Sequence, residues 1–230
     1  MIMPSTKLVV FDMAGTTVRD RGDVATAFIT ALTELGVPKP ATEDVNDVMG
    51  FRKIDAIRIL IDKYGAPENA DIELLIEKIH QRFTELMIGF YQNDKDLQPL
   101  PYAENLFREL HEKGVKVALN TGFTRPVTEA ILHRLNWKNN PLIDAVICSD
   151  EVPEGRPEPF MIQAIMEQLG ISSSSQVVKV GDTEVDVQEG RNANCGLVVS
   201  VTTGAATREQ LQQFQPDHII DSLEELPSLI

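Results

Sequence analysis

Short apolar runs alternate with amphipathic stretches over most of this chain, and that alternation limits the fold more than any other feature. Runs that predict strands lie at 8–11, 115–119, 145–147, 177–180, 197–201 and 218–220. Stretches that predict helices lie at about 102–113, 126–136, 158–169, 185–193 and 207–214. Parallel strands need crossover helices between them, so the pattern predicts an α/β fold with a doubly wound parallel sheet.

One interval breaks the alternation. From about residue 22 to 95 the apolar residues recur at helical spacing, as in Ile54, Ile57, Leu60 and Ile61, and no strand pattern is present. Prolines and acids then predict a linker at 93–101. We therefore expect a Rossmann-like core domain formed by 1–20 and 98–230, and a helical cap domain formed by 21–97.

Charge and composition restrict the partners. The formal net charge of −14 argues against nucleic acid and anionic membranes, but a local cluster of cations can still bind a small anion. No apolar stretch approaches the ~20 residues of a membrane span, and no export signal is apparent. The two cysteines, Cys148 and Cys195, lie far apart, as expected for a reduced protein. A cytoplasmic enzyme with a small substrate is the expectation.

Two of the predicted strands end in residues that suit catalysis. The run 8–11 ends at Asp12, and ligands of open α/β sheets bind beyond the carboxyl ends of the strands. Asp12 is therefore placed to be a nucleophile or a metal ligand. The run 115–119 leads to Thr121 and Gly122, where a helix is expected to begin, and backbone amides at a helix start bind phosphate.

Two further segments complete the expected site. Arg156 offers a cation before another predicted helix, and Asp182 ends a strand with Asp186 four residues later. Carboxylates that converge from strand ends repel one another unless a divalent cation lies between them. Oxygen ligands favour Mg²⁺, so Mg²⁺ is the expected cofactor.

Each of these residues has a structural interpretation when it is taken alone. Asp12 or Thr121 can cap a helix, Arg156 can form a surface ion pair, and the Gly-Asp-x-x-x-Asp spacing is weakly specific. The order of all four segments, each at the carboxyl end of a strand, favours a catalytic site.

These motifs together resemble the haloacid dehalogenase (HAD) superfamily, and within it the phosphonoacetaldehyde hydrolase (phosphonatase) group. The first two matching segments are Asp12-Met-Ala14-Gly-Thr16 and Thr121-Gly-Phe-Thr-Arg125. The next two are Val152-Pro-Glu-Gly-Arg156-Pro and Val180-Gly-Asp182-Thr-Glu-Val-Asp186-Val-Gln-Glu-Gly-Arg191-Asn-Ala. A cap-domain segment matches as well, Met49-Gly50-Phe51-Arg52-Lys53-Ile54-Asp55.

The resemblance implies roles for single residues. Asp12 is the implied nucleophile, and Thr121 and Arg156 hold the phosphoryl oxygens. Metal ligands are implied at Asp12, the carbonyl of Ala14, Asp182 and Asp186, the last directly or through water. Substrate contacts are implied at Thr16, Met49, Gly50, Gly122 and Arg156. Phosphonatase is dimeric through its cap, so a homodimer is also an expectation.

Ala14 and Lys53 narrow the chemistry. Phosphatases of the superfamily carry a second aspartate where this chain has Ala14, and that group protonates the leaving alkoxide. An enzyme without this acid favours a leaving group that needs no proton there. Lys53 can provide one by condensing with a carbonyl two atoms from phosphorus, so that the carbanion leaves as an enamine. The group's histidine three residues after this lysine is replaced by Ala56, which leaves the exact substrate open.

Three alternatives to a phosphonatase-like hydrolase remain. One is a phosphomonoesterase that acts on a small metabolite such as phosphoglycolate or a sugar phosphate. A haloacid dehalogenase also lacks the second aspartate, but it uses no metal, so Asp182 and Asp186 argue against it. The last is a catalytically idle scaffold, against which the intact Asp12, Thr121 and Arg156 argue.

Overall fold

A six-stranded parallel sheet forms the centre of the computed structural model, which describes residues 6–230. The strand order is β3-β2-β1-β4-β5-β6. The strands are β1 (Leu8–Asp12), β2 (Lys116–Thr121), β3 (Ala145–Cys148), β4 (Val177–Gly181), β5 (Leu197–Val201) and β6 (His218–Ile220). The α/β fold with a doubly wound parallel sheet is therefore confirmed, and every run that predicted a strand forms one.

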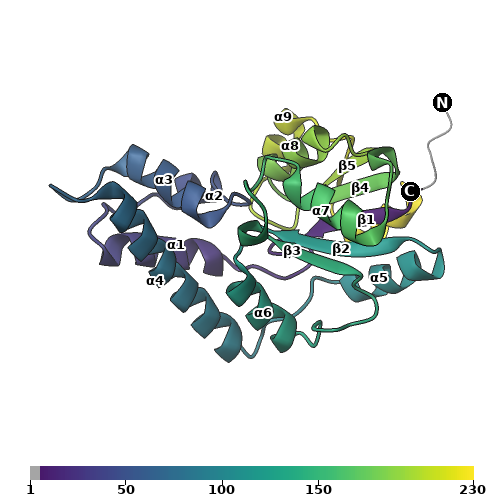
Figure 1. Ribbon diagram of the computed structural model, residues 1–230, viewed down its shortest axis with the longest axis horizontal. Coiled ribbons are helices and arrows are strands. Elements are labelled where there is room, and N and C mark those ends of the chain that lie inside the picture. The colour runs from purple at the N-terminus through teal and green to yellow at the C-terminus, as the bar shows by residue number, and fades with distance from the viewer. Residues whose placement is uncertain (1–5) are drawn as a thin grey trace.

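Helices cover both faces of the sheet (Figure 1). One face carries α5 (Ala103–Glu112) and α6 (Arg125–Arg134). The other face carries α7 (Phe160–Leu169), α8 (Glu184–Asn192) and α9 (Arg208–Phe214). Short 3-10 helices lie at Ser149–Glu151, Ser174–Gln176 and Leu223–Ser228.

The central strand β1 is buried along its whole length, which explains its unbroken apolar sequence. Its side chains alternate between two hydrophobic clusters, because successive residues of a strand point to opposite faces. Val9 and Phe11 belong to the larger cluster, whereas Leu8 and Val10 pack with Ile162 on the other side.

Four helices separate β1 from α5, and they lie beside the sheet at one end of the molecule (Figure 1). They are α1 (Asp23–Glu34), α2 (Thr42–Asn46), α3 (Lys53–Tyr64) and α4 (Ile72–Asn93). No strand lies within 23–93, all of which the structure describes. We refer to this segment as the helical insertion.

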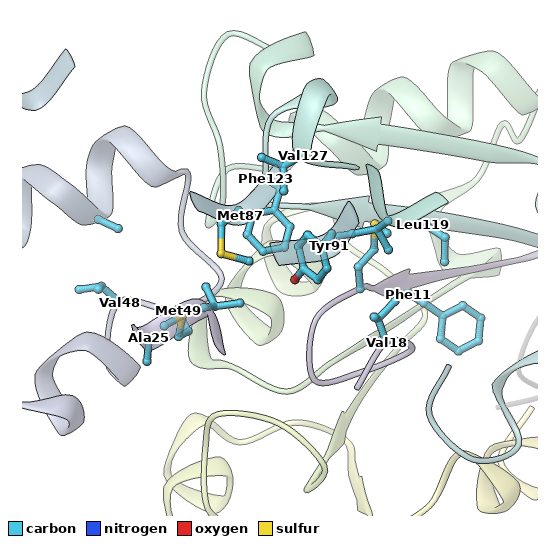
Figure 2. Close-up of a cluster of buried hydrophobic side chains, with 14 of the residues drawn as sticks. Phe11, Val18, Ala25, Val48, Met49, Met87, Tyr91, Leu119, Phe123 and Val127 are labelled. Carbon is cyan, nitrogen blue, oxygen red and sulfur yellow. The ribbon is translucent and has the colours of Figure 1, made fainter. Parts of the chain in front are cut away.

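The helical insertion shares its hydrophobic core with the sheet domain. Phe28 of α1 packs on Phe83 of α4, with ring centroids 4.3 Å apart. Phe123, which precedes α6, lies 6.4 Å from Phe83 and 6.1 Å from Tyr91 by the same measure. Figure 2 shows Phe123 together with Met87 and Tyr91 in this cluster. The insertion is thus held against α6 by buried aromatic contacts.

The structure also bears on the expectations about membrane-spanning helices and about the two cysteines. Among residues 6–230, the structure contains no helix that is both long and apolar enough to cross a membrane. Cys148 and Cys195 are both free thiols, as the spacing of the cysteines predicted.

Candidate active site

The polar strand ends meet at one edge of the sheet. Asp12 is the last residue of β1, and it pairs with Asn120 of the neighbouring strand, so Thr121 ends β2 just beyond it. Asp182 follows directly after β4, the neighbour of β1 on its other side. The register of three adjacent strands therefore brings the three predicted site residues together.

These residues line a small pocket, of about 30 Å³, that the core and the helical insertion enclose between them. The core contributes Asp12, Ala14, Thr121, Gly122, Phe123, Asp182, Thr183 and Ala205. The insertion and the segment that leads into it contribute Asp20, Val24, Met49, Gly50 and Lys53. Predicted site residues from distant parts of the sequence thus share one cavity.

Lys53 is the first residue of α3, and only 4 % of it is exposed. Its ammonium group lies 5.5 Å from the ring centroid of Phe28 and 5.0 Å from that of Phe123. Burial among these rings lowers the pKa of Lys53 from 10.5 to about 8, with the nearby Arg156 acting in the same direction and Asp12 opposing it. About a tenth of this amine is therefore neutral and nucleophilic at pH 7, far more than for a solvated lysine.

The turn after β1 is built around Asp182. Gly15 adopts a φ of +92°, and a Cβ at this position would lie 2.7 Å from Oδ2 of Asp182. Thr16 donates its hydroxyl to Oδ1 of Asp182 at 2.9 Å, and the amide of Ala205 donates to Oδ2 at 2.8 Å. Thr16 thus contacts Asp182, whereas the resemblance implied a contact with substrate.

The carboxylates of Asp12 and Asp182 suit a hard divalent cation. Burial raises the pKa of Asp12 to about 6, and Asp186 adds to that rise against the opposing charge of Arg156. Burial, with the charges of Asp12 and Asp186, raises the pKa of Asp182 well above its usual value. A divalent cation between these two acids would stabilise their ionised forms.

The protein ligands of that cation are few. No group of three or more His, Cys, Asp or Glu side chains within residues 6–230 is arranged to hold a metal ion. A metal at Asp12 and Asp182 therefore has to take further ligands from backbone carbonyls, substrate or water, which is the usual behaviour of Mg²⁺. Ala14 lines the same pocket, where its carbonyl was expected to contribute.

Arg156 lies beneath the pocket, with no part of its side chain exposed. Its Nη1 donates to Oδ1 of Asp12 at 2.7 Å, and its Nε donates to Glu189 at 2.9 Å. Its Nη2 donates to both oxygens of Asn120, at 2.9 and 2.7 Å. The guanidinium therefore orients the carboxylate of Asp12, and its predicted contact with phosphoryl oxygens stays a prediction.

A buried network of charged side chains surrounds Arg156, and no sequence motif pointed to it. Lys179 of β4 is fully buried and lies 3.0 Å from Glu189, 3.0 Å from Asp186 and 2.7 Å from Asn120. Glu189 also accepts both bonds that the Asn120 amide donates, at 2.8 and 3.0 Å. A lysine within an apolar strand was the available signal, because a buried ammonium requires a carboxylate partner.

Asp186 belongs to this network. One of its oxygens accepts the hydroxyl of Thr183 at 2.5 Å, and the other lies 3.1 Å from Arg156. Burial alone would raise the pKa of Asp186, but Arg156 and Lys179 outweigh it and hold the pKa below its usual value. Asp186 is thus an ionised partner of two cations, and its predicted metal contact stays a prediction.

Thr121 and Gly122 hold the loop before α6. The hydroxyl oxygen of Thr121 accepts the amide of Phe123 at 3.1 Å, so this side chain shapes the turn that lines the pocket. The helix itself begins at Arg125, three residues after Gly122 and one residue before the predicted stretch 126–136.

The loop that precedes α3 fits tightly against glycines of the core. A methyl group on Gly122 would collide with the carbonyl oxygen of Phe51 and lie 2.8 Å from that of Gly50. A methyl group on Gly155 would lie 2.6 Å from Cβ of Arg52, whose guanidinium donates to the carbonyl of Pro153 at 3.0 Å. The glycines thus allow Lys53 to approach the strand ends.

A second hollow, of about 370 Å³, adjoins the pocket. The two share Met49, Thr183 and Ala205 as wall residues. Its other walls come from the insertion, from the start of α8, and from α9 with the segment before it: Asn46, Asp47, Glu184, Val185, Ala206, Gln210, Gln213 and Phe214. Met49, Thr183 and Ala205 therefore separate the inner pocket from a wider outer cleft.

The fold and this site define the class of protein. Residues 9–200 match the family model described as haloacid dehalogenase-like hydrolase, and the chain belongs to that family. It is a HAD-superfamily hydrolase.

Curated relatives make the likeness more specific. The phosphonoacetaldehyde hydrolase of Syntrophobacter fumaroxidans is 37 % identical, over 94 % of this chain and 81 % of the relative. That of Bordetella avium is 30 % identical, over 96 % of this chain and 89 % of the relative.

Solved structures support the fold. A phosphonoacetaldehyde hydrolase-like protein from Oleispira antarctica superposes with a TM-score of 0.81 at 21 % identity, covering 99 % of this chain and 92 % of its own. A predicted phosphoglycolate phosphatase from Haemophilus somnus superposes with a TM-score of 0.79 at 20 % identity, covering 99 % of both chains.

Proposed function

We propose that this protein is a Mg²⁺-dependent phosphonatase-like hydrolase that cleaves the C–P bond of a 2-oxoalkylphosphonate, phosphonoacetaldehyde or a close analogue. The observation that carries the proposal is the position of Lys53. A buried amine with a pKa of about 8 lines the same pocket as Asp12, the residue placed to attack phosphorus. Hydrolysis of a phosphate ester needs no neutral amine, whereas this route to C–P cleavage does.

Lys53 supplies the electron sink. Its neutral amine adds to the substrate carbonyl, and loss of water gives an iminium ion. The carboxylate of Asp12 then attacks phosphorus and forms an aspartyl-phosphate, while the C–P electron pair moves into the iminium and leaves as an enamine. Because this leaving group needs no proton on the atom that departs, Ala14 is no handicap. Water then hydrolyses the aspartyl-phosphate, which releases phosphate and restores the carboxylate of Asp12.

The surrounding residues place these two groups. Arg156 holds Oδ1 of Asp12 at 2.7 Å and leaves Oδ2 for the attack. The loop at Thr121 and Gly122 forms the wall that would receive the phosphoryl oxygens. A bound Mg²⁺ would neutralise charge on the phosphoryl group and on Asp12, held by Asp12, Asp182 and the Ala14 carbonyl, with Asp186 reaching it directly or through water.

Closure of the insertion would protect this chemistry from water. The small volume of the pocket and the burial of Lys53 describe an enclosed site, in which the iminium ion is shielded from premature hydrolysis. The helical insertion then acts as a cap over the core.

Borohydride trapping tests the proposal. The protein is incubated with phosphonoacetaldehyde, Mg²⁺ and borohydride, and the peptides are then mapped by mass spectrometry. We expect a reduced adduct on Lys53 and none on the exposed Lys95, which serves as the internal control. Lys53→Ala should lose both the adduct and the release of phosphate from phosphonoacetaldehyde.

A phosphomonoesterase is the second candidate, favoured by the structural likeness to the phosphoglycolate phosphatase of Haemophilus somnus. Under this alternative the wild-type protein forms no adduct and hydrolyses phosphoglycolate. Lys53→Ala then keeps the wild-type rate on that ester. This pair of results would replace the phosphonatase-like assignment.

A further inference from the structure

The Schiff-base route requires proton transfers that the residues assigned so far do not provide. Dehydration of the carbinolamine needs an acid to protonate the departing hydroxyl, and the enamine needs a proton on carbon before the product is released. Positions 14 and 56 lie beside Asp12 and Lys53 in the sequence, and both are alanines. The acid for these steps therefore has to be another residue that lines the pocket.

Four titratable side chains line the pocket: Asp12, Asp20, Lys53 and Asp182. Asp12 is the proposed nucleophile, Lys53 the proposed amine and Asp182 a proposed metal ligand. Asp20 is the remaining one, and no motif of the sequence analysis pointed to it. It lies in the segment that leads from the core into the helical insertion, between the turn after β1 and the start of α1.

The carboxyl group of Asp20 is held in place. Its Oδ1 accepts the amides of Gly22 and Asp23, both at 3.0 Å, and these bonds fix the side chain at the beginning of α1. They occupy one oxygen only, so the other can exchange a proton. Burial raises the pKa of Asp20 above its usual value even though these amides lower it, which favours a carboxyl that binds and releases protons.

The charges around Asp20 come from several elements. Lys53 of α3 and Asp12 and Asp182 of the core line the same pocket. Asp23 of α1 adds a negative charge that raises the pKa of Asp20, and the negative charge of Asp20 in turn raises the pKa of the buried Tyr91 hydroxyl on α4. Lys53 is thus the cationic group with which Asp20 shares the cavity.

We propose that Asp20 is the acid–base group of the Schiff-base steps, an inference that rests on the proposed function. In the forward direction the carboxyl of Asp20 donates a proton to the carbinolamine hydroxyl, which leaves as water as the C=N bond forms. The iminium nitrogen keeps its own proton, because a neutral imine is a poor electron sink, and the resulting carboxylate takes up a proton from solvent. After the C–P bond breaks, the same carboxyl protonates the enamine carbon. Water then hydrolyses the iminium to the carbonyl product and free Lys53, and the proton released in this step recharges Asp20.

A helix-capping role is the structural alternative, since Asp20 already accepts two backbone amides. Asp20→Asn separates the two roles, because an asparagine carbonyl accepts the same amides but cannot transfer a proton. Asp23→Asn is the matched control: Asp23 is the next acid in the same turn, it pairs with Arg21 at 3.6 Å, and it does not line the pocket.

The experiment compares wild type, D20N, D20A and D23N. Borohydride trapping of Lys53 in the wild type comes first, because a missing adduct there refutes the proposed function itself and this inference with it. When the adduct forms, phosphate release from phosphonoacetaldehyde is measured for all four proteins, and thermal unfolding shows whether each variant is folded.

We expect D20N to lose roughly 10²- to 10⁴-fold in turnover, the usual contribution of a general acid–base group. D23N removes only a charge that raises the pKa of Asp20, so its turnover should stay within a few-fold of wild type. Added formate should restore part of the turnover of D20A, because it can enter the space of the missing carboxyl, and a purely structural role predicts no such rescue. A wild-type rate for D20N, or a D20A protein that formate does not accelerate, overturns the assignment and leaves the proposed function standing.

Discussion

Lys53 occupies a position that is unfavourable for its own charge. The side chain is buried between Phe28 and Phe123, and no carboxylate of the described residues lies within ion-pair distance of its ammonium group. Desolvation therefore dominates the pKa of Lys53, and the charges of Asp12, Asp20 and Asp182 offset only part of it. The amine is kept reactive at the expense of the stability of the fold.

The first prediction concerns this cost. The pKa of Lys53 is 10.5 in the unfolded chain and about 8 in the fold, and each pKa unit corresponds to about 1.4 kcal/mol. Lys53→Met should therefore raise the free energy of unfolding at pH 7, by about 3 kcal/mol. It should also abolish trapping by borohydride.

The stability gain of K53M over wild type should depend on pH, in the direction that the two pKa values of Lys53 set. Below pH 8 the lysine is protonated in both states and the penalty is complete, and it disappears as the pH rises from about 8 to 10.5, where the unfolded chain also loses the proton. Urea unfolding of K53M and wild type at several pH values checks this, with Lys95→Met as the exposed control. An equal stability of K53M and wild type at pH 7 would show that the ammonium is well solvated.

Single residues also show where sequence reasoning succeeded and where it ended. Asp12, Thr121 and Asp182 were predictable, because polar residues at the ends of apolar runs mark the carboxyl edge of a parallel sheet. The orientation of Arg156 was not, because its partners Asp12 and Glu189 are brought to it only by the tertiary fold. The acid at position 20 was hidden for the same reason, since nothing local distinguishes it from a helix cap.

At the scale of elements, the loop that precedes α3 is the link between insertion and core. It carries Met49 and Gly50 into the pocket, and it presses Phe51 and Arg52 against glycines of two core loops. The position of Lys53 depends on this contact, because the lysine is the next residue along the chain. Small substitutions at the core glycines should therefore change the reactivity of Lys53 through the loop that carries it.

The second prediction follows from that contact. Gly122→Ala places a methyl group in collision with the carbonyl of Phe51, so the loop must lift away from the core. We expect adduct formation on Lys53 and turnover to fall by about 10²-fold, the usual effect of misplacing a catalytic group by an ångström. Rates of borohydride trapping and of phosphate release measure this.

Gly89→Ala is the matched control, since Gly89 lies within α4 and a Cβ there meets nothing within 4 Å. It should leave trapping unchanged and slightly stabilise the helix. Wild-type trapping by G122A would mean that the loop position does not set the reactivity of Lys53.

The elements themselves were well predicted from the sequence, while their ends and contacts were not. The strand at 197–201 and that at 218–220 form as expected, since each is an apolar run between turn signals. The helix expected at about 126–136 forms at Arg125–Arg134, after Thr121 has closed a turn onto the amide of Phe123. The docking of the insertion on α6 required buried aromatic contacts that no periodicity reveals.

At the scale of the whole molecule, the excess of negative charge extends into the site. A chain with a net charge of −14 holds Asp12 and Asp182 together in one pocket, and the pKa of each carboxyl is raised by burial and by neighbouring acids. The folded state should therefore gain stability from any divalent cation that binds between them.

The third prediction measures that gain. Mg²⁺ at a hundred times its dissociation constant should stabilise the fold by about 2.7 kcal/mol, and a chelator should remove the effect. Asp182→Asn should abolish the Mg²⁺-dependent shift in melting temperature and raise the stability of the metal-free protein, because it removes one of the repelling carboxylates.

Asp62→Asn, a change of the same charge on the exposed face of α3, serves as the control and should keep the Mg²⁺ response. Differential scanning calorimetry of the three proteins with and without Mg²⁺ decides the matter. A D182N protein that still gains stability from Mg²⁺ would place the cation elsewhere.

The wall that the inner pocket shares with the outer cleft affects how substrate enters the site and how product leaves it. Met49 stands between the two cavities, and its unbranched thioether side chain turns readily between rotamers. Thr183 and Ala205, which complete the shared wall, are short, so Met49 is the shared residue whose movement can most widen the opening. A long chain beyond the carbonyl of a substrate needs more space than one side chain can clear, so we expect its exchange to require movement of the helical insertion. The size of the substrate would thus decide whether one turnover needs the movement of Met49 alone or of the four helices of the insertion.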